Sequence, residues 1–282
     1  MSATLVSATW LGAHLDDVVV LDASSHLPTA GRNPHEEFHA AHIPGAQRFD
    51  IDRIADPDSH LPHMVPTPDD FAAHMRTLGL SNDDHVVMYD DSDVRSAARG
   101  WWMMRLFGHR TVSILDGGLP AWKAAGGDME AGPAQDRPMG DFSPQQPAGV
   151  GVVDMASLRA SIESGDGGQI LDARASARFA GSAPEPRKGL RAGHIPGSHN
   201  LPFTALLNAD GTYQDAGTMR ARFVESGIAP DAPVVTSCGS GVTACVLAVS
   251  LHILGNEAVS VYDGSWTEWG ASDAPIETGA AE

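Results

Sequence analysis

The chain has 282 residues, a length typical of about two domains. Its 36 Asp and Glu residues outnumber 18 Lys and Arg residues, and the net charge of −18 disfavours nucleic acid and anionic membrane surfaces as partners. Two cysteines exclude a disulfide-stabilised secreted scaffold and favour a reducing, cytoplasmic location. The sequence has no apolar run of about 18 residues and no basic, apolar leader, so we expect neither a transmembrane helix nor a secretory signal.

The sequence repeats itself at an offset of about half its length. Four segments recur in one order with nearly constant spacing, which a duplicated domain explains at once. The pairs are VVVLDAS (18–24) with QILDAR (169–174), AAHIPGA (40–46) with RAGHIPGS (191–198), HVVMYDDSD (85–93) with PVVTSCGSG (233–241), and SILDGGLPAW (113–122) with SVYDGSWTEW (260–269).

The residues between the two copies, 126–149, are rich in Gly, Pro and Gln and show no hydrophobic periodicity. Such a composition is typical of a linker. We therefore place a first domain at residues 1–125, a linker at residues 126–149 and a second domain at residues 150–282.

Two motifs of the first copy have simple structural interpretations. Residues 35–39 (HEEFH) match the H-E-x-x-H pattern of zinc hydrolases. A zinc site needs a third ligand, and His42, just before a Pro-Gly turn, is not at a known ligand spacing. The second copy has no such histidine pair, so we expect a solvated helix and no metal site. Residues 101–107 (WWMMRLF) are expected to form a core helix.

The second copy alternates helices and short apolar strands. Asp154 can cap a helix whose apolar positions are Met155, Leu158 and Ile162. The elements expected after it are a strand ending at 171–172, a helix at 218–226, a strand at 233–237, an apolar helix at 242–254, a strand at 258–262 and a short helix near Trp266. This order predicts an α/β fold in which each copy has a mainly parallel sheet with helices on both faces.

Ligands of such sheets bind beyond the carboxyl ends of the strands, where Asp172 and Cys238 both fall. Cys238 starts a loop between a strand and a helix. Glycines let that loop curl so that its N–H groups point inward, and the helix adds its positive N-terminal end. This setting stabilises a thiolate, the nucleophilic form of cysteine. The residues expected to cradle a sulfur bound to Cys238 are Gly239, Ser240, Gly241, Val242 and Thr243.

Two other interpretations of the cysteines are weaker. Cysteine phosphatases need an arginine six residues after the nucleophile to clamp phosphate, and this position is Ala244. Cys245 falls on the following helix and is expected to be buried and inert. The sequence leaves open whether it has a redox role.

The tandem copies, the two HIPG segments and the loop CGSGVTA together resemble the two-domain rhodanese-type sulfurtransferases, over essentially the whole chain. The loop is most similar to that of the members that use 3-mercaptopyruvate. Members that prefer thiosulfate typically have CRKGVT, with two cations where this chain has Gly239 and Ser240. Thiosulfate is a dianion and benefits from those cations, whereas mercaptopyruvate has a single carboxylate.

The resemblance also implies roles for two arginines. In the mercaptopyruvate enzymes, a matching RF-x-G…PEPR segment supplies two arginines that hold the carboxylate and keto group of the substrate. Arg178 and Arg187 fall at those positions. An arginine fork suits this task because it binds a carboxylate with two parallel hydrogen bonds.

A second constellation is implied by the same resemblance. The second aspartate of FDID and a histidine eleven residues later form a triad with the loop serine, which here means Asp52, His63 and Ser240. Such a relay can move the proton that a departing enolate needs. The residues between Asp52 and His63, including His60, differ from the usual family pattern.

The first copy has no nucleophile. Aligning VVMYD with VVTSC places Asp90 where the second copy has Cys238, and an aspartate cannot hold sulfane sulfur. The first domain is therefore expected to be structural and to contribute Asp52 and His63.

The resemblance implies transfer of sulfur from 3-mercaptopyruvate through a Cys238 persulfide to a thiol such as thioredoxin, or to cyanide, with release of pyruvate. No metal or organic cofactor is expected. One alternative is thiosulfate:cyanide sulfur transfer on the same residues. A second is a non-catalytic persulfide-binding module, which would need neither Arg178 nor Arg187.

Overall fold

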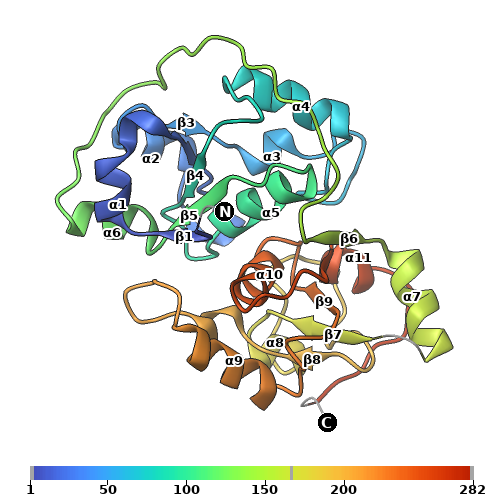
Figure 1. Cartoon of the computed structure of the whole chain (residues 1–282). Helices are drawn as coiled ribbons and strands as arrows, with labels where there is room; N and C mark the ends of the chain where they lie inside the picture. The colour runs from blue at the N-terminus through green and yellow to red at the C-terminus, as the bar shows by residue number, and fades with distance from the viewer. Residues whose placement is uncertain (1–2, 166–167, 280–282) are drawn as a thin grey trace. The chain divides into compact units, whose positions relative to one another are not determined.

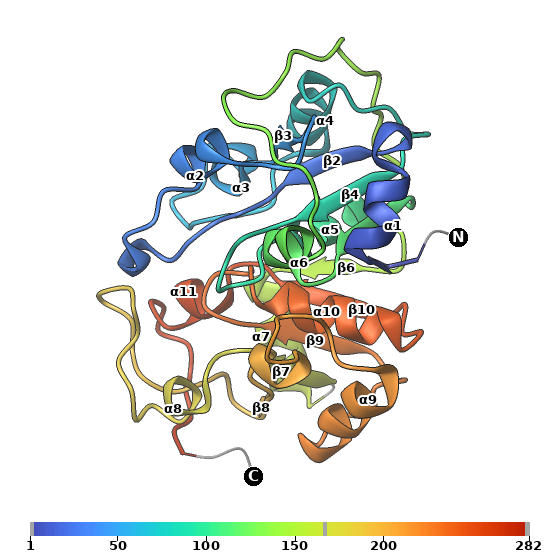
Figure 2. The same cartoon turned by 90° about the vertical axis from the view of Figure 1, so that its left-hand side faces the viewer.

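The computed structural model describes residues 3–165 and 168–279, which form two compact units (Figures 1 and 2). The first unit takes the chain up to Pro57, then Val65–Ala148 and Ala209–Thr212. The second takes Asp58–Met64, Gly149–Asn208 and the chain from Tyr213 onward. Each half of the sequence thus gives one short segment to the unit built mainly from the other half.

The first unit contains a five-stranded parallel sheet in the order β1-β5-β4-β2-β3. Its strands are β1 (Leu5–Val6), β2 (Val19–Asp22), β3 (Gln47–Arg48), β4 (Val86–Tyr89) and β5 (Val112–Leu115). Its helices are α1 (Ala8–Ala13), α2 (Pro34–Ala40), α3 (Ile51–Ile54), α4 (Pro68–Thr77), α5 (Ala97–Leu106) and α6 (Gly118–Ala124), with 3-10 turns η1 (Leu15–Asp17) and η2 (Pro28–Ala30).

The second unit repeats this plan with the sheet order β6-β10-β9-β7-β8. Its strands are β6 (Gly151–Val153), β7 (Gln169–Asp172), β8 (His199–Asn200), β9 (Val234–Ser237) and β10 (Val259–Tyr262). Its helices are α7 (Met155–Ser164), α8 (Ser176–Phe179), α9 (Ala216–Glu225), α10 (Ala244–Ile253) and α11 (Ser265–Trp269), with the 3-10 turn η3 (Phe203–Leu206). Renumbered within each copy, the two strand orders are identical, which confirms the tandem parallel α/β fold.

Local chemistry explains where these elements begin. The Asp154 carboxylate accepts the Ser157 N–H at 2.7 Å and caps α7, as expected from the sequence. The apolar segments before and after Cys238 form β9 and α10. Helix α10 starts at Ala244 rather than at Val242, because the two preceding residues complete the loop.

The helices that pack on the central strands are buried along most of their length. Every residue of α5 is buried, which confirms the core helix predicted for 101–107. In the second unit, α10 is buried from Ala244 to Leu251 and packs on β9 and β10. A helix that is apolar on all sides belongs in a core, and α10 thereby holds the end of the cysteine loop rigidly.

The segment predicted as a linker packs along the first unit as far as Ala148. The Phe142 ring is buried edge-on against Phe71, with centroids 5.8 Å apart. The backbone N–H groups of Phe142 and Gln145 donate to the carbonyls of Leu80 and Phe107 at 3.0 and 2.9 Å. One aromatic anchor and scattered backbone bonds leave no hydrophobic period, so composition alone could not reveal this docking.

Candidate active site

Cys238 lies at the carboxyl end of β9 and begins the loop that leads into α10. Its side chain is buried, and Ser240 two residues later is nearly so. Gly241 adopts φ 75°, in the left-handed region that favours glycine, and this residue turns the chain toward α10. The strand–loop–helix setting expected for Cys238 is therefore present.

Helix α11 fixes this loop through Ser265, a contact that sequence reasoning missed. The Ser265 hydroxyl accepts the N–H groups of Cys238 and Gly241 at 3.1 and 3.2 Å, and donates to the Tyr262 carbonyl at 2.8 Å. Two further donors hold the loop carbonyls. The Trp266 N–H donates to Cys238 at 3.0 Å, and the Thr267 N–H donates to Gly239 at 2.8 Å.

Not all of the loop N–H groups expected to bind the sulfur are available for it. Ser265 already accepts the N–H of Gly241, one of the five residues assigned to that cradle. In the part of the chain that the structure describes, the N–H groups of the other four residues, Gly239, Ser240, Val242 and Thr243, have no acceptor. These four amides are the ones that remain for a bound sulfur.

Ser265 also distinguishes the two copies. It stands at φ 49°, and the corresponding Gly118 of the first copy stands at φ 60°. In both copies the next residue donates its N–H to the residue after the central strand: Leu119 to Asp90 at 2.8 Å, and Trp266 to Cys238. At this position the first copy has glycine and the second copy has serine. Glycine adopts a positive φ at a lower cost in free energy than serine, so the second copy accepts backbone strain in order to place a hydroxyl here. The Gly-to-Ser difference between DGG and DGS was the sequence signal for this residue.

We predict that Ser265→Ala lowers the free energy of unfolding by about 2 kcal/mol, because two buried N–H groups lose their acceptor. Ser265→Gly loses the same acceptor but relieves the left-handed backbone, so it should be about 1 kcal/mol more stable than Ser265→Ala. Urea unfolding of the two variants measures both differences. Equal stability of both variants and the unchanged chain would contradict this role of the hydroxyl.

A buried network of charges lies beside the loop. The Arg174 guanidinium is fully buried and donates from Nη2 to Asp172 at 2.7 Å and from Nη1 to Glu185 at 2.8 Å. Its Cζ lies 4.3 Å from the centre of the Trp266 ring. Glu185 also accepts from Arg178, at 2.5 Å from Nη2 and 3.2 Å from Nε. Burial alone would lower the pKa of Arg174, but the neighbouring Asp172 and Glu185 carboxylates raise it on balance.

Of the two arginines expected to hold the substrate, Arg178 lies against the cysteine loop and Arg187 lies beside His63. A Cβ added to Gly239 would lie 3.2 Å from Nη2 of Arg178, so this guanidinium lies against the cysteine loop. Nη2 of Arg187 faces Nε2 of His63 at 3.5 Å, which places these two sequence-predicted residues together in the second unit. A guanidinium only donates, so the facing ring nitrogen of His63 is the acceptor.

His63 reaches the second unit because residues 58–64 belong to it, and it adopts φ 63° there. That backbone conformation is uncommon for a residue other than glycine. Asp52 lies in the first unit, on the first turn of α3. The triad of Asp52 with His63 and Ser240 stays a prediction.

In the first unit, Asp90 follows β4 as Cys238 follows β9. Its carboxylate accepts the N–H groups of Ala97 and Ser92 at 2.6 and 3.3 Å. Burial raises the pKa of Asp90 to about 6, and the Ala97 N–H and the Arg95 charge offset part of that rise. This loop thus binds its own carboxylate.

The raised pKa of Asp90 predicts a pH-dependent stability. The pKa of Asp90 is about 6 in the folded chain and 3.8 in the unfolded chain. The stability that protonation of Asp90 gives the folded chain is therefore fully present below pH 3.8 and is lost as pH rises through 6. We expect the free energy of unfolding, compared with that of Asp90→Asn, to rise by about 1.4 kcal/mol between pH 8 and pH 5. Denaturant unfolding at both pH values measures this difference, and parallel curves for the two chains would contradict it.

The H-E-x-x-H motif lies on α2. The exposed His35 pairs with Asp50 through Nε2 and Oδ2, 2.9 Å apart. His42 is buried and stacks on Phe38, with ring centroids 3.9 Å apart. Among residues 3–165 and 168–279, no group of three or more His, Cys, Asp or Glu side chains could hold a metal ion.

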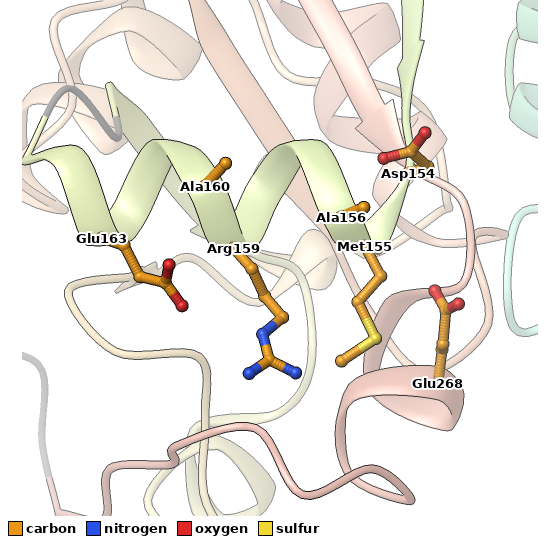
Figure 3. Close-up of a pocket in the computed structure, with 7 residues that line it drawn as sticks. All are labelled: Asp154, Met155, Ala156, Arg159, Ala160, Glu163 and Glu268. Carbon is orange, nitrogen blue, oxygen red and sulfur yellow. The ribbon is translucent and has the colours of Figure 1, made fainter.

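A separate surface hollow lies between α7 and α11 (Figure 3). Glu268 faces it from α11, and Met155, Arg159 and Glu163 line it from α7. It contains none of the residues predicted from the sequence to bind or react. Within the described part of the chain, no helix is both long enough and apolar enough to cross a membrane.

A family model described as "Rhodanese-like domain" matches the chain twice, at residues 7–125 and 154–272. The chain therefore belongs to the rhodanese-like family, as a tandem of two such domains. This agrees with the repeated strand order and with the loop that follows β9.

Similar proteins narrow the comparison to sulfurtransferases. The 3-mercaptopyruvate sulfurtransferase of Escherichia coli (strain K12) is 44% identical, over 98% of this chain and 99% of its own length. Thiosulfate/3-mercaptopyruvate sulfurtransferase 1, mitochondrial, of Arabidopsis thaliana is 44% identical, over 98% of this chain and 79% of its own length. The crystal structure of SseA from Escherichia coli, described as a 3-mercaptopyruvate sulfotransferase with the rhodanese fold, has a TM-score of 0.84 at 40% identity and covers 94% of this chain and 99% of SseA.

Proposed function

We propose that the chain transfers sulfane sulfur from 3-mercaptopyruvate to a thiol or cyanide acceptor, through a persulfide on Cys238, and releases pyruvate. The observation that carries this proposal is the position of Arg178, whose guanidinium lies against a cysteine loop that has no cation of its own. An arginine fork there suits one carboxylate beside the reacting sulfur. The names of the E. coli and Arabidopsis relatives support the same donor.

The first half-reaction forms the persulfide. The Cys238 thiolate attacks the donor sulfur, the carbon–sulfur bond breaks, and its electron pair leaves on the enolate of pyruvate. The enolate takes up one proton to become pyruvate. Arg178 and Arg187 hold the carboxylate and keto oxygen, and their positive charges stabilise the enolate oxygen as it forms.

In the second half-reaction an acceptor thiolate attacks the outer sulfur of the persulfide. The sulfur–sulfur bond breaks and Cys238 leaves as a thiolate, ready for another donor. The four unengaged loop amides, at Gly239, Ser240, Val242 and Thr243, donate to the outer sulfur in between. The cycle is ping-pong and needs no metal or organic cofactor.

The proton for the enolate is assigned to Ser240, His63 and Asp52. His63 lies beside Arg187, hence next to the proposed position of the keto oxygen. Ser240 lies two residues from the nucleophile. A serine–histidine–aspartate relay of this kind moves protons in acyl transfer, where the aspartate orients the histidine.

The domain roles follow the proposed mechanism. Residues 1–125 form a domain without a nucleophile, because Asp90 occupies the cysteine position. Residues 126–149 connect it to the catalytic domain at 150–282. A thiol protein such as thioredoxin is the proposed acceptor, and the cytoplasm, where thiols stay reduced, is the proposed location.

Initial rates with two donors test the proposal. Pyruvate release from 3-mercaptopyruvate and sulfite release from thiosulfate are measured with one thiol acceptor, and again with cyanide. We expect kcat/KM to favour 3-mercaptopyruvate strongly. A preference for thiosulfate would keep the fold and Cys238 but replace the donor, and turnover of neither donor would favour a persulfide-binding module.

A further inference from the structure

The loop that follows β4 in the first unit uses its own N–H groups. The Asp91 N–H donates to the Ser24 hydroxyl at 2.9 Å, and the Ser92 N–H donates to Oδ1 of Asp90 at 3.3 Å. Asp90 follows β4 directly. The second bond therefore shows that, in this fold, the N–H two residues further along the loop can point back at the side chain of the residue that follows the central strand.

The corresponding N–H groups of the second unit, those of Gly239 and Ser240, have no acceptor among the described residues. Two differences between the copies account for this. Arg174 occupies the position of Ser24, and a guanidinium only donates. The residue after the strand is Cys238, whose sulfur is a weaker acceptor than a carboxylate. The matching registers of β2 with β4 and of β7 with β9 support this alignment of the two copies.

The Gly239 carbonyl is held by two hydrogen bonds from Thr267 on α11. The Thr267 N–H donates to it at 2.8 Å and the Thr267 hydroxyl at 2.6 Å. The peptide bond between Gly239 and Ser240 is trans, so its C=O and N–H point in opposite directions. Thr267 therefore holds the Ser240 N–H facing away from α11, on the open side of the loop.

This contact of Thr267 is specific to the second copy. The neighbouring bond, from the Trp266 N–H to the Cys238 carbonyl, is not, because the Leu119 N–H makes the same bond in the first copy. Pro120 follows Leu119 and occupies the position of Thr267. A proline has neither an N–H nor a hydroxyl, so the first copy has no donor for the next carbonyl of its loop.

We infer that Thr267 is a positioning residue for sulfur transfer. By holding the Gly239 carbonyl, it directs the Ser240 N–H at the sulfur of Cys238. Its two hydrogen bonds also polarise the peptide group, which strengthens that N–H as a donor to a negatively charged sulfur. The inference rests on the proposed function and extends it to a residue that does not touch the substrate.

The experiment is a single turnover in which 3-mercaptopyruvate is mixed with an increasing excess of the chain and pyruvate release is followed. Thr267→Val keeps the size and the N–H of threonine but loses the hydroxyl. We expect its maximal rate to fall about fivefold. Thr267→Pro copies the first unit and removes both hydrogen-bond donors, so its maximal rate should fall about fiftyfold. Thr267→Ser keeps both donors and should react within about twofold of the unchanged chain.

The concentration dependence separates positioning of the sulfur from binding of the substrate. The Ser240 N–H acts on the reacting sulfur and not on the substrate carboxylate. The concentration of chain that gives half of the maximal rate should therefore stay within about twofold in Thr267→Val. A purely structural role would lower the melting temperature of Thr267→Val and leave the maximal rate of the folded chain unchanged.

Thr77→Val is the matched control. The Thr77 hydroxyl donates to the Ala73 carbonyl at 2.9 Å on an exposed part of α4 in the first unit. Its removal should leave the maximal rate within about twofold of that of the unchanged chain. If Thr267→Pro does not fold, the comparison of Thr267→Val with Thr267→Ser decides alone.

An unchanged maximal rate in Thr267→Val would overturn the inference, and so would an equal loss in Thr267→Ser. The proposed function fails on a different result. If the unchanged chain releases no pyruvate from 3-mercaptopyruvate, the proposed function is wrong and the inference falls with it.

Discussion

Replacing Cys238 by serine (Cys238→Ser) is expected to lower sulfur transfer from either donor by about 10⁴-fold or more, because a serine hydroxyl is not ionised at neutral pH and cannot hold sulfane sulfur. The fold should be unaffected, since the hydroxyl is smaller than the thiol and the surrounding bonds use the backbone of Cys238 rather than its side chain. Initial rates of pyruvate and sulfite release, with a thermal melt of the same sample, measure both effects.

Cys245 provides the matched control. Its thiol donates to the Gly241 carbonyl at 3.2 Å, and a serine hydroxyl can make the same bond. Cys245→Ser should therefore retain activity within about threefold. Comparable loss in both variants would show that the chemistry does not depend on Cys238 alone, and would contradict the proposed mechanism.

The second large effect is expected at the arginine beside the loop. Arg178→Ala should lower kcat/KM for 3-mercaptopyruvate by about 10²–10³-fold, because hydrogen bonds to a charged substrate contribute about 1.5–3 kcal/mol each. Arg178→Lys keeps the charge but loses the fork, so it should recover only part of the rate. Steady-state rates of both variants, compared with the rate of the unchanged chain, test whether the two parallel hydrogen bonds of the Arg178 guanidinium are needed.

Arg159→Ala is the control for Arg178→Ala. Arg159 is a partly exposed arginine of the second unit that pairs with the exposed Asp273 at 3.3 Å. Such surface pairs contribute little to stability, so its removal should change neither stability nor rate measurably. An Arg178→Ala rate equal to that of Arg159→Ala would contradict the proposed role of Arg178 in holding the substrate carboxylate.

Much of the fold was readable from the sequence because the duplication repeats its signals. Short apolar strands followed by capped helices indicated parallel sheets, and the second copy supplied the same order again. Cys238 could be singled out because a strand, two glycines and an apolar helix surround it. These patterns involve residues that are close together in the sequence, so they can be recognised without the structure.

The parts that could not be predicted depend on contacts between residues distant in sequence. Ser265 lies 27 residues after Cys238, and its hydroxyl accepts the N–H of that residue. In the sequence, the DGS segment is typical of an ordinary turn and gives no sign of this contact. Glu185 looked like part of a substrate segment, whereas its carboxylate joins two arginines. No periodicity indicated that residues 58–64 would join the second unit and place His63 beside Arg187.

A single turnover without a second acceptor tests whether Cys238 takes the sulfur of 3-mercaptopyruvate as a persulfide. The chain is mixed with one equivalent of 3-mercaptopyruvate and no other thiol or cyanide, pyruvate is quantified, and the protein is digested for mass spectrometry. We expect one pyruvate per chain and one added sulfur atom on the peptide that contains Cys238. Pyruvate release without added sulfur, or sulfur on the peptide of another residue, would contradict it.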